Sequence, residues 1–223
     1  EVEEEAGEIP SSVLPEALEG RVDWREELVL TIDPADARDF DDAIWLREHE
    51  QGWELAVHIA DVAHYVKPGT ALDREARERG NSTYLVDRVL PMLPEALSNG
   101  ICSLVPGEDR LTCCVVIRFD GKGKMKQVRF EKAVIRSKFR LTYEEAQDML
   151  EGKRDVDDPS RCGIASTLRE CWKLAKLLRQ RRFVQGALDL DFPEIRVELD
   201  ESGRPAGYRR EDYNESHQLI EEF

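Results

Sequence analysis

The sequence contains no long apolar run, and its first quarter is nearly free of basic residues. No stretch of eighteen apolar residues occurs, and the acidic start EVEEEAGEIP differs from the basic and then apolar start of a signal peptide. No internal repeat is present, and no low-complexity tract follows the acidic start. We therefore expect a soluble, cytoplasmic protein that does not enter a membrane.

Cysteine pairs with C-x-x-C spacing are also missing. The five cysteines are an odd number and include no C-x-x-C pair. A disulfide framework or a zinc site usually shows such pairing, so neither is indicated. We expect reduced thiols that are mostly buried.

The charge of the chain is strongly acidic and unevenly distributed. Its 223 residues carry 32 Lys and Arg against 47 Asp and Glu, which gives 32 − 47 = −15. Residues 1–61 hold 19 acidic residues and only four arginines, a net of 4 − 19 = −15, so residues 62–223 balance at 28 of each sign. Affinity for phosphate depends on Lys and Arg, so the total charge of the chain argues against nucleic-acid binding, whereas the distribution of the charge does not.

Strand patterns occur early in the chain and helix patterns later. A hydrophobic content of 41% is enough for a sizeable core. Without a steady alternation of strands and helices, the fold class is predicted to be α+β, with mixed or antiparallel sheets and helices packed around them. An acidic lead-in at 1–21 precedes the main unit at 22–223. The expected strands are 28–32, 43–46, 53–62, 111–120, 124–139, 187–199 and a segment near 207–209, and the expected helices are 72–79, 143–150, 166–183 and a last one capped by Asn214.

A dense run of aspartates lies between the first two of these strands, in TIDPADARDFDDA at 31–43. Like charges this close repel one another unless they are solvated or a cation compensates them. A solvated acidic loop is the simplest alternative, but the run contains apolar Phe40 and continues directly into a core strand. Ligands of a metal pair must converge, so the loop must fold back on itself, and Pro34 can start that turn. The aspartates of the run are Asp33, Asp36, Asp39, Asp41 and Asp42.

The choice of cation can be tested by position. Counted from Asp33, an EF-hand loop needs Gly at its sixth position and Glu at its twelfth, where this chain has Arg38 and Ile44. This count argues against the hypothesis of an acidic structural domain stabilised by calcium. The remaining hypothesis is Mg²⁺ shared between carboxylates and a substrate phosphate, with Mn²⁺ as a substitute.

Several long motifs appear in a fixed order. TIDPADARDFDDA is followed by WELAVHIADVAHYV, STYLVDRVLPMLPEALSNGICSL, GALDLDFPE and HQLIEEF. From about Val22 onward the sequence closely resembles the catalytic RNB domain of the ribonuclease II and ribonuclease R exoribonucleases, and bacterial ribonuclease R is the nearer relative. The resemblance implies a Mg²⁺-dependent hydrolase that degrades single-stranded RNA processively from the 3′ end and releases nucleoside 5′-monophosphates.

The resemblance also implies roles for particular residues. The family's catalytic, metal-binding aspartates fall on Asp33, Asp39, Asp41 and Asp42, whereas Asp36 occupies a position that the family pattern leaves free. The family tyrosine that packs on the RNA 3′ end matches Tyr84. At Leu190 some members carry an aromatic residue. The family domain is longer than this chain, and its further part carries an arginine that acts at the scissile phosphate. We therefore expect the N-terminal portion of a catalytic domain, with the C-terminal half and the flanking cold-shock and S1 RNA-binding domains outside it.

Three further features allow more than one interpretation. His58, Asp61 and His64 resemble a metal motif, but residues 58 and 61 of one strand point to opposite faces, which favours a structural role with Asp61 paired to a neighbouring backbone or basic group. Residues 118–140 hold nine Lys and Arg against two acids, a net of +7, which suits either an RNA track or a solvated hairpin face. A catalytically silent RNA- or protein-binding module remains the alternative function, although all four family aspartates are present.

Overall fold

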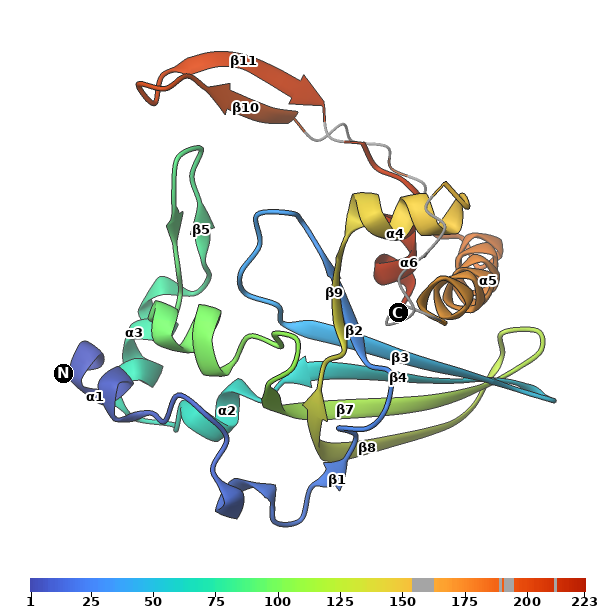
Figure 1. Ribbon diagram of the computed structural model, residues 1–223, viewed down its shortest axis with the longest axis horizontal. Helices are drawn as coiled ribbons and strands as arrows, with labels where there is room; N and C mark the ends of the chain where they lie inside the picture. Colours follow the sequence, from blue (N-terminus) through green and yellow to red (C-terminus); the bar gives the residue numbers. More distant parts are fainter. Residues whose placement is uncertain (154–162, 189, 191–194, 211) are drawn as a thin grey trace.

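The protein is described by a computed structural model that covers residues 1–153, 163–188, 190, 195–210 and 212–223. A seven-stranded mixed sheet forms its centre, in the order β1-β8-β7-β4-β3-β2-β9 (Figure 1). β1 pairs with β8 and β2 with β9 in parallel, and the other neighbours are antiparallel. The strands are β1 (Val22–Asp23), β2 (Leu30–Asp33), β3 (Asp42–His49), β4 (Gly52–Ala60), β7 (Asp109–Asp120), β8 (Met125–Arg136) and β9 (Phe139–Thr142).

The turn between β3 and β4 shows why the central hairpin forms where it does. Gly52 has a φ of 143°, and a Cβ at this position would lie 2.2 Å from the carbonyl oxygen of Phe119 on β7. Only glycine permits this approach of two backbones. β4 itself is buried along almost its whole length, because β3 and β7 flank it and both sheet faces are covered.

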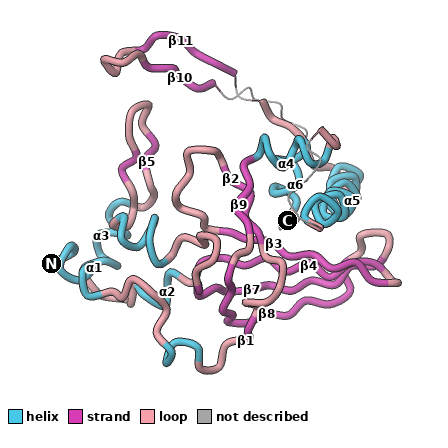
Figure 2. The backbone as a smooth tube through the Cα atoms, in the orientation of Figure 1, coloured by secondary structure: helices cyan, strands magenta, loops and turns pink. Residues whose placement is uncertain are grey.

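Helices α4 (Tyr143–Leu150), α5 (Ile164–Val184) and α6 (Glu215–Glu222) cover one face of the sheet (Figures 1 and 2). α4 begins with the predicted capping box, in which Thr142 and Glu145 each satisfy the other's backbone N–H. Asn214 caps α6 as predicted. The core beneath these helices contains Leu30, Leu55, Leu141, Leu168, Leu174 and Leu219, all at most 1% exposed.

The other face carries a second core around two tryptophans. The rings of Trp24 and Trp45 meet edge to face with their centres 5.1 Å apart, and Phe40 and Val116 belong to the same cluster. A third, smaller core joins the beginning of the chain to the segment after β4. It includes buried side chains of α1 (Val2–Glu8), α3 (Ala71–Arg79) and the π-helical turn η2 (Ala96–Ile101), beside the short helices η1 (Pro15–Leu18) and α2 (Val62–Tyr65).

Two hairpins project from the main sheet on the same side of the molecule (Figure 1). They are β5 (Thr83–Tyr84) with β6 (Val89–Leu90), and β10 (Ile195–Leu199) with β11 (Pro205–Arg210). The predicted strand at 187–199 is found only over β10, and residues 189 and 191–194 of it lie outside the described part of the chain.

The predicted α+β class is confirmed, and one predicted strand is corrected. The sequence indicates a single strand over 124–139, but β8 ends at Arg136 and β9 begins at Phe139. β8 pairs with β7, whereas β9 pairs with β2. Between them, the backbone N–H of Lys138 donates to the carbonyl of Val29, so the chain leaves β7 here and continues beside β2. Of the four described cysteines, Cys102, Cys114 and Cys171 are buried and Cys113 is exposed.

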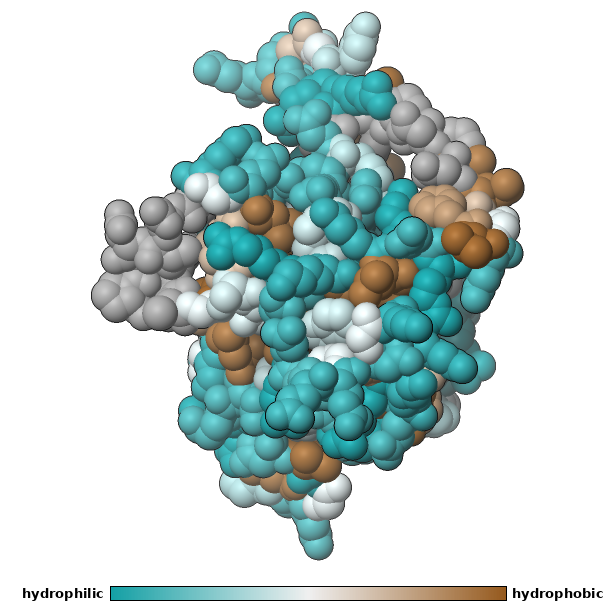
Figure 3. Space-filling view, turned by 90° about the vertical axis from the view of Figure 1, so that its right-hand side faces the viewer, coloured by the Kyte–Doolittle hydropathy of each residue, from teal (hydrophilic) through white to brown (hydrophobic). Residues whose placement is uncertain are grey.

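The described residues include no helix long and apolar enough to cross a membrane. The side that carries α5 and the β7–β8 turn is mostly hydrophilic, with separate small apolar areas (Figure 3).

Candidate active site

The aspartate loop, residues 33–42, connects β2 to β3 and folds back on itself. Asp33 is the last residue of β2 and Asp42 is the first residue of β3. The two strands run antiparallel side by side, with Leu30 opposite Ile44. The turn begins at Pro34, whose carbonyl accepts a hydrogen bond from the N–H of Ala37 at 3.1 Å. The predicted reversal of the loop is therefore present.

The second half of the loop is fixed by Phe40, the apolar residue within the acidic run. Its ring is 8% exposed, its N–H donates to Ser103 Oγ at 3.0 Å, and its carbonyl accepts from the N–H of Leu104 at 2.9 Å. The Ser103 hydroxyl donates in turn to the carbonyl of Arg38 at 2.7 Å. Next to it, the N–H of Ala60 donates to the carbonyl of Asp41 at 2.9 Å. Backbone bonds from other elements therefore hold the aspartates on both sides of Phe40 in place.

Burial and mutual repulsion act together on the carboxyl groups of the loop. The pKa of Asp33 is raised to about 6, mainly by burial and also by the charges of Asp42 and Asp39, whereas the nearby Thr31 hydroxyl and Arg140 oppose the rise. Burial also raises the pKa of Asp41, with added repulsion from Asp39 and Asp42, and burial raises the pKa of Asp42. Oxygen Oδ2 of Asp33 is buried and has no hydrogen-bond partner among the described residues. Asp39 and Asp42 thus lie close enough to Asp33 and Asp41 to raise the pKa of those two carboxyl groups.

These carboxylates have the chemistry that hard divalent ions prefer. Within the described residues, no group of three or more His, Cys, Asp or Glu side chains is arranged so that it could hold a metal ion. Mg²⁺ commonly takes only one or two carboxylates from a protein and completes its shell with water and substrate phosphate oxygens. The unpartnered Asp33 oxygen and the mutual repulsion fit such an incomplete, substrate-shared site.

Tyr84 reaches the aspartate loop from the β5–β6 hairpin. Its hydroxyl donates to Oδ2 of Asp39 at 3.0 Å, while the residue remains 67% exposed. Partial burial, this hydrogen bond and the charges of Asp39 and Asp41 raise the pKa of Tyr84, so the hydroxyl stays protonated as a donor. Asp36, by contrast, forms an ion pair with Arg196 on β10. The structure therefore brings Tyr84 to the aspartates and directs Asp36 elsewhere.

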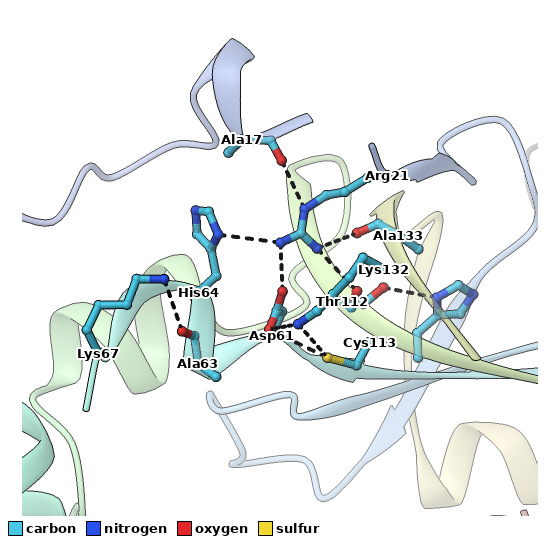
Figure 4. A network of polar contacts seen from close by, with 11 residues as sticks. Ala17, Arg21, Asp61, Ala63, His64, Lys67, Thr112, Cys113, Lys132 and Ala133 are labelled. Atoms are coloured by element: carbon cyan, nitrogen blue, oxygen red, sulfur yellow. Dashed lines mark hydrogen bonds and ion pairs between the residues drawn. The ribbon is translucent and has the colours of Figure 1, made fainter. Parts of the chain in front are cut away.

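The His58, Asp61 and His64 motif is occupied by internal contacts. His58 is buried with Nδ1 at 3.1 Å from the Thr112 hydroxyl, and burial lowers its pKa to about 3, so the ring is neutral. Asp61 accepts from Arg21 and from Lys132, each at 2.7 Å, and Arg21 also lies 3.4 Å from His64 (Figure 4). The predicted pairing of Asp61 with a basic group is confirmed.

Most cations of the 118–140 stretch are paired with carboxylates. Arg118 and Arg129 both contact buried Glu54, and Lys126, Lys132 and Arg136 pair with Asp120, Asp61 and Asp109. The Asp120 and Met125 end of this hairpin also lies at the opposite end of the sheet from Asp42. Five of the nine cations of this stretch are therefore paired with carboxylates, and its turn end is not directed at the aspartate loop.

Arg140 is a functional candidate that sequence reasoning missed. Its guanidinium group donates to the carbonyl of Pro34, directly after Asp33, and lies over the Phe40 ring at 5.4 Å. The RLTY segment shows nothing that assigns this arginine to the aspartate loop. Only the parallel pairing of β9 with β2 places it there.

Comparison with known proteins identifies the family. The family model of the RNB domain matches residues 21–223. The chain belongs to the RNB domain family. Ribonuclease R of Thermotoga maritima is 44% identical over 225 residues, which cover 100% of this chain and 31% of that protein. Mycoplasma genitalium RNase R in complex with ribose-methylated single-stranded RNA superposes with a TM-score of 0.92 at 32% identity, covering 99% of this RNB chain and 34% of that one.

Two limits follow from the same comparisons. This RNB chain spans about a third of the length of the curated relatives it matches. Yeast Ssd1, described as a pseudonuclease, shares the fold with a TM-score of 0.64 at 21% identity, covering 77% of this chain and 20% of that one. The RNB fold alone therefore does not decide between an active and a silent protein, and the residues of the site must do so.

Proposed function

We propose that this chain is part of an exoribonuclease that hydrolyses single-stranded RNA from the 3′ end and releases nucleoside 5′-monophosphates. The observation that carries the proposal is the placement of Asp33, Asp39, Asp41 and Asp42 in one loop that folds back on itself and is anchored at Phe40. Burial and repulsion disfavour closely spaced carboxylates, and bound cations would offset that cost. The RNA-bound Mycoplasma relative supports the substrate class.

The four aspartates would hold Mg²⁺, with Mn²⁺ as a substitute, and when bound these ions activate water and stabilise charge at a phosphate. The chain's own residues provide the setting. Phe40, anchored by Ser103 and Leu104, keeps Asp39 and Asp41 on a rigid backbone. Tyr84 offers an exposed ring beside Asp39, on which the last base of an RNA could stack.

We further propose that the chain divides into a lead-in at 1–21 and the RNB portion at 22–223. We also propose that the active enzyme is longer than this chain. Arg21, at the boundary, is nearly buried and bonds to the carbonyls of Ala17, Thr112 and Ala133 as well as to Asp61 (Figure 4). Relatives about three times longer than this chain support a contribution from further sequence. A cytoplasmic location stays a prediction.

The test compares full-length wild-type protein with Asp41→Asn and with the control Asp36→Asn. Asp41→Asn removes a charge from the proposed ligand set, so the single-turnover rate should fall by at least about 100-fold while RNA affinity is kept or rises. Asp36→Asn changes the same loop outside the set and should stay within a few-fold of wild type. EDTA should abolish hydrolysis, and Mg²⁺ or Mn²⁺ should restore it.

The alternative function, a catalytically silent binding module, predicts the opposite result in these experiments. A binding module without chemistry would hold RNA equally well with or without EDTA and would release no mononucleotides. Undiminished hydrolysis by Asp41→Asn, or in the chelator, would remove the metal-dependent mechanism.

A further inference from the structure

Arg140 lies on the strand beside the entry to the aspartate loop. β9 pairs in parallel with β2, and Arg140 is the register partner of Thr31. Leu141 next to it is buried in the core beneath the helices. Side chains alternate along a strand, so Arg140 leaves the sheet on the other face, where the Phe40 ring belongs to the tryptophan cluster.

The side chain contacts both halves of the loop at once. A guanidinium N–H donates to the carbonyl of Pro34, and Pro34 directly follows Asp33. The guanidinium carbon lies 5.4 Å from the centre of the Phe40 ring, and Phe40 separates Asp39 from Asp41. A planar, charged group can form a hydrogen bond in its plane and stack on an aromatic face, which an ammonium group cannot do. Arg140 therefore links the first aspartate to the later ones.

One further observation agrees with this role. The buried Nε of Arg140 has no hydrogen-bond partner among the described residues, so Pro34 and Phe40 are the contacts that orient the group. These two contacts thus set the geometry of the guanidinium group at the aspartate loop.

We propose that Arg140 is a positioning residue that fixes the distance between Asp33 and the aspartates flanking Phe40. This inference rests on the function proposed above. The loop keeps its anchors to Ser103, Leu104 and Ala60 without Arg140, so the fold should survive its loss. The Pro34 end should then move relative to the Phe40 end. A displacement of about 1 Å in a catalytic group can cost about 100-fold in rate.

The test uses full-length protein with Arg140→Met, Arg140→Lys and the control Arg136→Met. Methionine keeps an apolar stem of similar length but removes the charge and the donors. Arg136 lies on β8, the preceding strand in the chain, which is not adjacent to β9 in the sheet, and its hydrogen bond and ion pair are formed with Asp109 and not with the loop. Arg140→Met should lower kcat about 10- to 100-fold with KM within about twofold, and Arg136→Met should match wild type. Arg140→Lys keeps the charge without the planar group and should be intermediate.

A second readout does not depend on activity. Hydrogen–deuterium exchange of the peptide covering residues 33–42 should be at least several-fold faster in Arg140→Met than in Arg136→Met, with melting temperatures within a few degrees. If Arg140→Met fails to fold, Arg140→Lys carries both measurements.

Two outcomes overturn the inference. Either kcat of the Arg140 variant matches the control, or the loop exchanges at the wild-type rate. In both cases Asp41→Asn, measured alongside, shows whether the proposed function stands. A slow Asp41→Asn with a normal Arg140→Met removes only the positioning role.

Discussion

Tyr84 combines an exposed ring with a hydrogen bond from its hydroxyl to Asp39, and two substitutions separate the two contributions. Tyr84→Phe removes only the donor to Asp39, whereas Tyr84→Ala also removes the ring. A stacked base contributes about 1–3 kcal/mol, enough to change the length at which short products dissociate. We therefore predict altered end-product lengths for Tyr84→Ala and wild-type lengths for Tyr84→Phe, measured on denaturing gels with 5′-labelled RNA. Identical products from wild type and Tyr84→Ala would leave Tyr84 as an ordinary structural aromatic.

The sequence is informative about residues whose chemistry is unusual where they stand. Five aspartates in one run indicate a site because their repulsion needs compensation, and Phe40 within the run argues against a simple solvated loop. Arg140 and Arg21 carry no such signal, because each is an ordinary arginine until the fold brings its partner close. Their roles depend on contacts with residues distant in the sequence, which spacing along the chain does not reveal.

Strand β4 carries a buried acid that joins three strands of the sheet. Glu54 is 3% exposed and accepts from Arg47 on β3 at 2.7 Å, from Arg118 on β7 at 3.1 Å and from Arg129 on β8 at 3.0 Å. Burial by itself would raise the pKa of Glu54, but the hydrogen bonds from these arginines outweigh it and lower the pKa to about 2. The carboxylate is therefore charged at neutral pH.

This network makes stability depend on pH in a predictable direction. A lowered folded-state pKa contributes stability above the unfolded value near 4.5, and the contribution is lost as the pH falls toward about 2. Glu54→Gln should lower the free energy of unfolding by about 1–3 kcal/mol at pH 7, less than for a fully buried pair because the arginines are about half exposed. The difference from wild type should shrink between pH 4.5 and 2.

Urea unfolding at pH 7, 4 and 3 measures this effect. Glu48→Gln, on an exposed position of β3, serves as the control and should change stability by less than about 0.5 kcal/mol. A difference between Glu54→Gln and wild type that stays constant down to pH 3 would contradict the assigned pKa.

Local patterns account for much of the secondary structure. Gly80 ends α3 with a φ of 75°, and the capping boxes begin α4 and α6, because these signals act within a few residues. The division of 124–139 into β8 and β9 was missed, since its cause is the pairing of Lys138 with Val29. The lead-in helix α1 was missed for a related reason: Glu5 on α1 accepts from the first N–H groups of α3.

The net negative charge of the whole chain is unfavourable for strong RNA binding by this chain alone. Its net charge is −15, and five cations of the basic stretch are already paired with carboxylates. We predict that the 223-residue chain binds single-stranded RNA at least about tenfold more weakly than the full-length protein and hydrolyses it slowly. Fluorescence anisotropy at two salt concentrations measures the affinity and its salt dependence. Equal affinity and rate for the two proteins would show that the chain is sufficient.

The pairing of β2 with β9 also determines when the site can form during synthesis. Asp33 leaves the ribosome 139 − 33 = 106 residues before the first residue of β9. At about 5–20 residues per second, this interval is roughly 5–20 s. Throughout it, Arg140 has not been made and the aspartate loop lacks the strand beside it. A nascent chain therefore carries all four aspartates before it has the contacts that organise them, and the proposed site can form only after β9 has been synthesised.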